Sequence, residues 1–164
     1  MNAVADSSPL IILARLGCID LLNKIFSNLY ISTEVHHEVV VAGAGLPGAS
    51  EVENAEWIEV KKLQNQADLL AAQQKYGLGL GELSTILLAK EIHATAALLD
   101  DYNARKLAKA EGLHVRGSVG LLETFYRRGH LSDLRGAFQQ LLGHSYIDQR
   151  LLDLRLQALG LPPL

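Results

Sequence analysis

The sequence predicts an α/β protein: a three-layer α/β/α sandwich around a mostly parallel central sheet of about four or five strands. Three observations predict it. The chain has 164 residues, which is close to the size of one domain. Apolar residues make up 49% of it and charged residues 20%, enough for a core and unlike a disordered chain. Short apolar segments also alternate with helical ones, which favours a parallel sheet.

The strand candidates are short and apolar. Residues 96–99 are Ala-Ala-Leu-Leu and stop at two aspartates, a pattern typical of a strand buried on both faces. Residues 57–60 alternate between apolar and polar side chains, which indicates a half-exposed or edge strand. The other strand candidates are residues 2–5, 29–31 and 113–115.

Several start and stop signals delimit the helices. Ser8 before Pro9 predicts the start of the first helix, with Ser8 as its N-cap, and Ser32 or Thr33 is expected to cap the helix after residues 29–31. Residues 42–50 hold three glycines and a proline and predict a loop. Further helices are predicted at 66–76, from 81 to about 92, and at 102–111, 118–128, 131–142 and 145–159. We expect residues 1–130 to form one domain and residues 131–164 a helical extension packed on it.

Composition excludes several classes of protein. The single cysteine, Cys18, rules out an internal disulfide and a thiolate metal cluster within one chain. No apolar run approaches about 18 residues, and the start of the chain lacks the basic and apolar regions of a secretion signal. We therefore expect a cytoplasmic protein that does not enter a membrane.

Charge is distributed unevenly along the chain. Residues 1–101 contain 13 Asp and Glu against 6 Lys and Arg, whereas residues 102–164 contain 5 against 9. Either this is an ordinary solvated surface, or an acidic site lies beside a basic surface that holds phosphates. The basic candidates for such an RNA-binding rim are Lys106, Lys109, Arg116, Arg127 and Arg128.

Carboxylates follow the predicted strands. Asp6 comes directly after strand 2–5, and Asp100 and Asp101 come after strand 96–99. The carboxyl ends of parallel strands meet at one edge of the sheet, where ligands bind. Glu82 lies in the first turn of the helix that leads into strand 96–99, and that helix starts at the same edge. The topology alone thus brings these acids together.

A fourth segment adds two more acids. Glu34 and Glu38 are four residues apart on the predicted helix after residues 29–31 and so share a face. Carboxylates brought close together repel one another unless a cation neutralises them. Mg²⁺ and Mn²⁺ prefer oxygen ligands and keep positions for waters and a phosphate. The set therefore predicts a divalent metal site suited to phosphodiester hydrolysis.

All of these acids except Glu38 also have a purely structural explanation. Glu34 and Glu82 can simply favour a helix N-terminus through the helix dipole. Asp6 can be a capping residue. Either Asp100 or Asp101 can cap helix 102–111 while the other binds the metal.

Five short motifs occur in a characteristic order: Asp6-Ser7-Ser8-Pro9-Leu10, a helix containing Glu38, Gly81-Glu82, Leu98-Leu99-Asp100-Asp101-x-x-Ala104-Arg105, and Gly117-Ser118-x-Gly120-Leu121-Leu122. In this order, over about residues 3–130, they resemble the PIN-domain superfamily. The nearest branch is that of stand-alone prokaryotic PIN-like proteins related to VapC toxins. The chain departs from many PIN nucleases in carrying Glu, not Asp, at position 82.

The resemblance implies a Mg²⁺- or Mn²⁺-dependent endoribonuclease that hydrolyses RNA. Its catalytic acids would be Asp6, Glu38, Glu82, Asp100 and Asp101, and all of these except Glu38 would bind the metal. Ser8 and Ser118 would supply hydroxyls that hydrogen-bond a ligand acid or a water, and Arg105 would pair with a carboxylate or a phosphate.

The resemblance also implies partners. RNA is the expected substrate, a small antitoxin protein would fill the cleft, and the chain would form a homodimer. The alternative is a catalytically silent PIN-like module that binds nucleic acid or a partner protein. A receiver-like or phosphatase domain is disfavoured, because Arg116 and Gly117, not a lysine, follow strand 113–115.

Overall fold

The computed structural model describes residues 1–144 and 147–164. Contacts between Cα atoms divide the chain into two compact units, Met1–Ser118 and Val119–Leu164. The domain boundary expected at residue 130 stays a prediction. Among the described residues, no helix combines the length and apolar character needed to cross a membrane.

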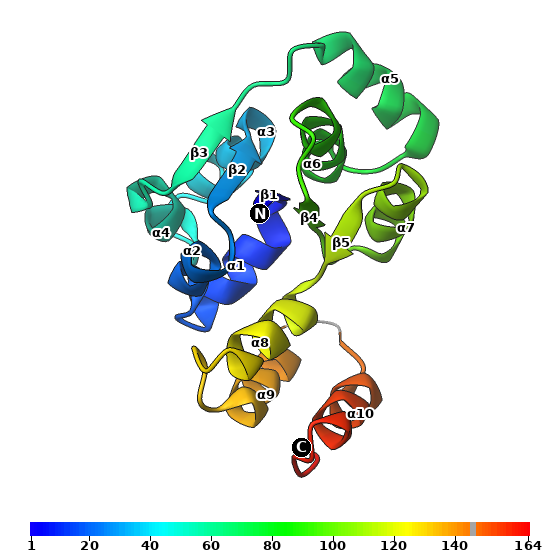
Figure 1. Ribbon diagram of the computed structural model, residues 1–164. Helices are drawn as coiled ribbons and strands as arrows, with labels where there is room; N and C mark the ends of the chain where they lie inside the picture. The colour runs from blue at the N-terminus through cyan, green and yellow to red at the C-terminus, as the bar shows by residue number, and fades with distance from the viewer. Residues whose placement is uncertain (145–146) are drawn as a thin grey trace. The chain divides into compact units, whose positions relative to one another are not determined.

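The first unit is built around a five-stranded sheet in the order β3-β2-β1-β4-β5, and every neighbouring pair of strands is parallel (Figure 1). This confirms the predicted α/β class and the mostly parallel sheet. The predicted edge strand is also confirmed, because β3 has a neighbour on one side only. The strands are β1 (Asn2–Ala5), β2 (Asn28–Ser32), β3 (Ile58–Lys61), β4 (Ala96–Leu98) and β5 (His114–Arg116).

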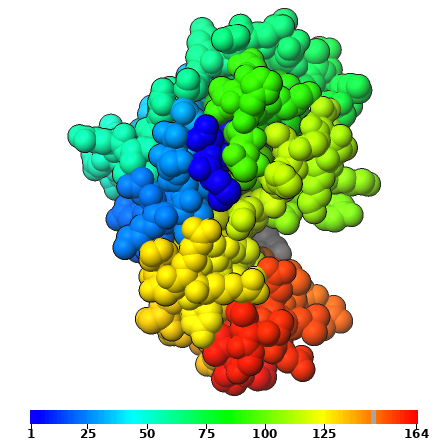
Figure 2. All heavy atoms as spheres, in the orientation of Figure 1, coloured from blue at the N-terminus to red at the C-terminus, as the bar shows by residue number. Residues whose placement is uncertain are grey.

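The central strands are apolar because they are covered on both faces. All of β4 and the last three residues of β1 are buried. Small alanines fill much of both strands, so helices can approach the sheet closely from either side. The dark blue start of the chain is at the surface in Figure 2, between a lighter blue and a green segment.

Helices cover the two faces. On one face, α5, α6 and α7 pack on Val4, Ala97 and Leu99. The other layer contains α1 and α4, which contact each other. The helical elements are α1 (Ser7–Arg15), η1 (Ile19–Leu21), α2 (Leu22–Ile25), α3 (Thr33–His36), the π-helix η2 (His37–Val41), α4 (Ala49–Asn54), α5 (Gln66–Tyr76), α6 (Leu80–Glu91) and α7 (Tyr102–Ala110).

Two local expectations were wrong. Helix α1 begins at Ser7, so Ser8 lies inside it and is not its N-cap. Pro9 is accommodated in the first turn, where its missing N–H would have no intrahelical partner. Residues 42–50 are not all loop, because α4 begins at Ala49 after Gly48, which adopts the left-handed conformation at φ 99°.

The second unit is helical. Its helices are α8 (Ser118–Arg127, whose first residue closes the first unit), α9 (Leu134–His144) and α10 (Gln149–Ala158). Arg155 of α10 donates two hydrogen bonds to Glu123 of α8, each of 2.6 Å. The predicted last helix, 145–159, is found from Gln149, and residues 145 and 146 of that prediction lie outside the described residues.

Candidate metal and phosphate site

The strand order places the site. The strand order changes direction between β1 and β4. Parallel α/β sheets bind ligands outside the carboxyl ends of the strands at such a switch point, and we call this position the crevice. Asp6 directly follows β1, and its backbone N–H donates to the carbonyl of Leu98 at the end of β4. Asp100 lies two residues beyond that point. Both aspartates therefore stand at the position where parallel α/β sheets bind ligands.

Asp6 is a buried carboxylic acid with acidic neighbours. It is 5% exposed. Burial raises the pKa of Asp6 from 3.8 to about 7, the backbone N–H of Ser7 opposes that rise, and the nearby carboxylates of Glu82, Glu38 and Asp100 add to it. The charges of Glu82, Glu38 and Asp100 therefore all act on Asp6.

Gly81 brings Asp6 and Glu38 together. A methyl group placed on Gly81 would lie 2.9 Å from Asp6 Oδ1 and 2.7 and 2.9 Å from the two oxygens of Glu38. Three carboxylate oxygens therefore surround one small space above the first turn of α6, which we call the Gly81 cradle. Only glycine leaves that space open.

Glu38 reaches the cradle from the π-helix η2. The Ser7 hydroxyl donates to Glu38 Oε2 across 2.5 Å and holds the carboxylate beside Asp6. Glu34, the other acid of this segment, accepts instead from Thr33 Oγ1 at 3.0 Å. Among the residues that the structure describes, its buried Oε1 has no hydrogen-bond partner. The structure thus places Glu38, not Glu34, against Asp6.

Glu82 closes the N-terminus of α6. Its Oε2 accepts from the backbone N–H of Gly79 at 2.8 Å, in a capping box. Burial raises the pKa of Glu82, the Gly79 N–H lowers it, and the carboxylates of Asp101 and Glu38 raise it. The structural and the functional explanation of Glu82 therefore apply together: it caps a helix and belongs to the acidic group.

Asp100 is held by serines from two other segments. Its Oδ1 accepts from the backbone N–H of Ser118 at 2.7 Å, and its Oδ2 accepts from the hydroxyls of Ser118 at 2.7 Å and Ser8 at 3.0 Å. Ser8 and Ser118 thus both hydrogen-bond Asp100, one of the acids that the resemblance implies as a metal ligand. These bonds fix the orientation of the Asp100 carboxylate.

The two adjacent aspartates have different hydrogen-bond partners. Asp101 is the N-cap of α7, and its Oδ2 accepts from the backbone N–H of Ala104 at 2.9 Å. Asp100 does not cap α7 and accepts from Ser8 and Ser118 instead. Arg105 donates from Nη1 to the carbonyl of Leu99 at 3.0 Å, so it braces the chain just before Asp100. It pairs with a backbone carbonyl, where the sequence predicted a carboxylate or a phosphate.

A buried hydroxyl pair ties α6 to the segment that carries Glu38. Ser32, which caps α3 by accepting from Val35 N–H at 3.0 Å, lies 2.7 Å from Ser84 Oγ. Ser84 and Thr85 both donate to the carbonyl of Gly81, at 3.0 and 2.8 Å. Ser32 and Ser84 are fully buried. Hydrogen bonds are stronger away from solvent, so these bonds fix the backbone of Gly81 at the base of the cradle.

The donor set fits a hard divalent cation in part. Mg²⁺ in proteins is commonly bound by one or two carboxylates together with waters and substrate phosphates. The Gly81 cradle offers two such carboxylates, Asp6 and Glu38, around a space that a single methyl group would fill. Within the described residues, however, no three His, Cys, Asp or Glu side chains stand together in a geometry that holds a metal. The other three acids are engaged by Gly79, Ala104 and the two serines.

The predicted basic rim is divided between the units. Lys106 and Lys109 are exposed on α7, and Arg116 is half-buried at the end of β5. Arg127 and Arg128 are exposed at the end of α8, in the second unit.

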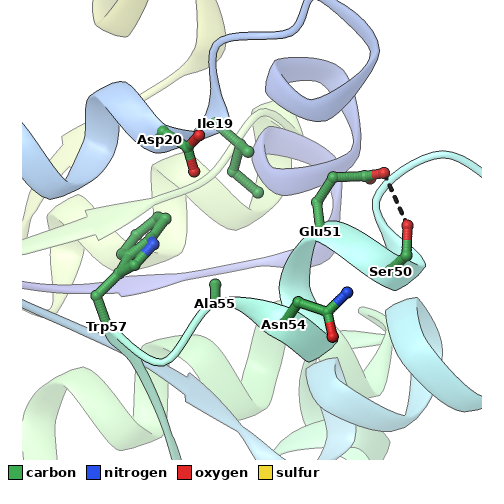
Figure 3. A pocket seen from close by; sticks show the side chains of 7 residues that line it. All are labelled: Ile19, Asp20, Ser50, Glu51, Asn54, Ala55 and Trp57. Atoms are coloured by element: carbon green, nitrogen blue, oxygen red, sulfur yellow. Dashed lines mark hydrogen bonds between the residues drawn. The ribbon is translucent and has the colours of Figure 1, made fainter.

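A separate hollow lies away from the acids. It has a volume of about 320 Å³ and includes Asp20, Ser50, Glu51 and Trp57 among its walls (Figure 3). Ser50 donates to Glu51 there at 3.0 Å. Trp57 precedes β3, so this hollow is near the amino end of the sheet, whereas Asp6 and Asp100 follow carboxyl ends.

Sequence reasoning missed two groups. Ser7 was not singled out, although it stands beside Asp6 and a hydroxyl next to a ligand acid is a usable signal. The sequence predicts a helix that begins at Gly81, whereas this glycine lies inside the first turn of α6, where a missing side chain signals a close approach of other groups. The pairing of Ser32 with Ser84 had no local signal, because the two are distant in sequence.

The comparisons with known proteins agree with this architecture. A search of the curated proteins finds no match. A PilT N-terminus domain protein from the hyperthermophilic archaeon Sulfolobus solfataricus P2 superposes with a TM-score of 0.50 at 18% identity, over 76% of this chain and 92% of that one. PAE2754 from Pyrobaculum aerophilum superposes with a TM-score of 0.54 at 18% identity, over 78% of this chain and 94% of that one. At this identity, both similarities concern the fold. The family model described as PIN domain matches residues 2–160, and the chain therefore belongs to the PIN-domain family.

Proposed function

We propose that this protein is a Mg²⁺- or Mn²⁺-dependent endoribonuclease. The observation that carries the proposal is the Gly81 cradle, in which Asp6 and Glu38 converge beside Asp100 at the crevice between β1 and β4. Membership of the PIN-domain family supports it, because PIN domains are commonly metal-dependent nucleases.

Asp6 and Glu38 would hold the cation, with Asp100 adding a carboxylate that Ser8 and Ser118 already orient. A bound Mg²⁺ or Mn²⁺ supplies charge stabilisation at the scissile phosphate and makes water a better nucleophile at neutral pH. Glu82 and Asp101 remain candidate ligands, and each would have to give up a helix cap to serve as one.

The remaining side chains position the reacting groups. Ser7 keeps Glu38 turned toward Asp6, and the Ser32–Ser84 pair fixes the carbonyl of Gly81 beneath them. Burial raises the pKa of Glu82, so this carboxyl group binds a proton more readily than an exposed glutamate does. Arg105 hydrogen-bonds the backbone carbonyl of Leu99 and so helps to fix the position of the next residue, Asp100.

Cleavage of a fluorescent single-stranded RNA, with Mn²⁺ and with chelator, tests the proposal. Asp6→Asn and Glu82→Gln should each abolish cleavage and keep the native circular dichroism spectrum. The matched control is Asp68→Asn, a surface aspartate on α5, which should cleave like the wild type. Full activity in both site variants would overturn the mechanism.

A second candidate is a catalytically silent PIN-like module that binds nucleic acid or a partner protein. It is favoured by one observation: within the described residues, no three potential ligands form a ready metal site. RNA binding that persists with chelator, together with no cleavage at any Mn²⁺ concentration, would establish this second function.

The toxin role is part of the same proposal. We infer from the family that a small antitoxin protein fills the crevice and that the chain forms a homodimer. Expression of the chain alone should then arrest growth, and Asp6→Asn should relieve the arrest. Sedimentation should give the mass of a dimer. Normal growth on expression of an active nuclease would contradict the toxin role, and a monomeric mass would contradict the dimer.

A further inference from the structure

One face of α7 carries an aromatic side chain followed by two lysines. Tyr102, Lys106 and Lys109 are spaced by four and three residues, so they lie in one row along the helix. All three are exposed, and Tyr102 is 76% exposed. The opposite face of α7 carries Ala104 and Ala108, which are fully buried against the sheet. We call the outward row the α7 stripe. The yellow-green segment that contains α7 is at the surface in Figure 2.

The α7 stripe begins at the candidate site. Tyr102 follows Asp101 directly and is two residues beyond Asp100, at the carboxyl edge of the sheet. From there the row runs along the helix for about 10 Å, the length of seven residues at 1.5 Å each. A strand of nucleic acid with one phosphate in the crevice would therefore pass next to the tyrosine ring.

The charges of the stripe are available to a phosphate chain. Within residues 1–144 and 147–164, neither Lys106 nor Lys109 forms a salt bridge. The acid nearest to them in sequence on the C-terminal side is Glu111, which already pairs with Lys90 at 2.7 Å. The positive charge of this face thus offsets the repulsion that the acids of the crevice exert on an incoming phosphate.

We infer that the α7 stripe binds unpaired nucleotides next to the scissile phosphate, with a base stacked on Tyr102 and phosphates paired with Lys106 and Lys109. The inference rests on the proposed function and assigns Tyr102 as the side chain that holds a base beside the reacting phosphate. A base inside a duplex already stacks on its neighbours and cannot present its face to a side chain. An exposed aromatic ring combined with cations along a groove or stripe is the usual means of binding single strands without sequence preference.

The test is the binding of a fluorescein-labelled oligouridylate to the full chain in chelator, so that cleavage plays no part. Tyr102→Ala should weaken binding by roughly 5- to 150-fold, the usual effect of losing one stacked base. Tyr102→Phe should bind like the wild type, because the ring is kept. Tyr76→Ala is the matched control, since Tyr76 is also an exposed tyrosine, 40% exposed, at the end of α5. It should leave binding unchanged.

Two further arms separate stacking from charge. With an oligonucleotide of the same length that lacks bases, Tyr102→Ala should have no effect. Each of Lys106→Ala and Lys109→Ala should reduce the slope of log K against log salt by about 0.7, the value expected for one phosphate contact on a single strand. Tyr102→Ala should leave that slope as it is.

The outcomes separate this inference from the proposed function. If Tyr102→Ala binds like the wild type, or if the wild type does not bind, the inference that the α7 stripe binds nucleotides is wrong. This holds even if the protein cleaves RNA with Mn²⁺. Binding that depends on Tyr102 and on a base supports it, even if no cleavage occurs. In that last case the nuclease proposal fails and the silent binding module takes its place.

Discussion

Replacing Asp6 by Asn should stabilise the metal-free protein at alkaline pH. Asp6 is 5% exposed, and burial together with neighbouring carboxylates raises its pKa from 3.8 to about 7. An acid whose pKa is higher in the folded than in the unfolded state binds its proton more tightly in the folded protein. Its contribution to stability is therefore present below the unfolded pKa and is lost as the pH rises through the folded pKa.

The magnitude follows from the shift. A rise from 3.8 to about 7 is about three pKa units, and each unit corresponds to about 1.4 kcal/mol. Above about pH 7 the ionised Asp6 thus costs the folded state about 4 kcal/mol relative to its protonated form. Between about pH 5 and pH 8, where part of this loss takes place, the wild type should lose about 2–3 kcal/mol that Asp6→Asn does not lose.

Urea unfolding in chelator across this pH range measures the effect. The difference in the free energy of unfolding between Asp6→Asn and the wild type should grow as the pH rises. Asp68→Asn, which changes an exposed aspartate of α5, should follow the pH dependence of the wild type. Addition of Mn²⁺ should then stabilise the wild type and leave Asp6→Asn unchanged, because ligand binding stabilises only the state that binds.

Two results would refute this reasoning. One is a difference in the free energy of unfolding between Asp6→Asn and wild type that does not vary with pH. The pKa of Asp6 would then be the same in the folded and the unfolded protein. The other is an Asp6→Asn variant that is less stable than the wild type at pH 8 without metal. The carboxylate would then be a stabilising group, and its placement among repelling acids would be wrong.

Three further predictions concern other parts of the structure. Gly81→Ala should weaken Mn²⁺ binding by about 1–3 kcal/mol, because the added methyl group overpacks the cradle. Gly120→Ala, where the methyl group meets nothing within 4 Å, should bind normally, and calorimetry showing equal binding in both variants would contradict the cradle. Arg155→Ala should destabilise the protein to urea by about 1–3 kcal/mol, because it leaves Glu123, with an 8% exposed side chain, without its partner. An unchanged midpoint of urea unfolding would show that the Arg155–Glu123 ion pair contributes nothing to stability. EDTA should stop RNA cleavage and Mn²⁺ should restore it, and cleavage that continues in EDTA would exclude a metal-dependent reaction.

The order and type of the elements could be predicted because apolar runs and start signals are local. The buried strand at residues 96–98 and helix 66–76 are both recognisable from neighbouring residues alone. Boundaries were less predictable where two signals competed. Asp6 and Ser8 are both good N-cap residues, and the helix begins after the first of them, which leaves Ser8 free to bond Asp100.

The candidate site could be predicted only in outline. Parallel topology brings Asp6 and Asp100 to one edge whatever the side chains do, so their proximity follows from the strand pattern. Which acid of the 34–38 segment turns inward depends on a π-helix and on the Ser7 hydroxyl, and neither is visible in the periodicity. The role of Asp101 depends on one hydrogen bond that its side chain accepts from the backbone N–H of Ala104. The sequence does not show which of the two adjacent aspartates, Asp100 or Asp101, accepts this bond.

The central claim is that the Asp6 and Glu38 carboxylates form the core of a divalent metal site. Calorimetric titration of Mn²⁺ into the wild type, Asp6→Asn and Glu38→Gln tests it most directly. The account predicts binding by the wild type that either substitution removes, with the fold intact by circular dichroism. Absence of binding in the wild type, or equal binding in all three proteins, would contradict it.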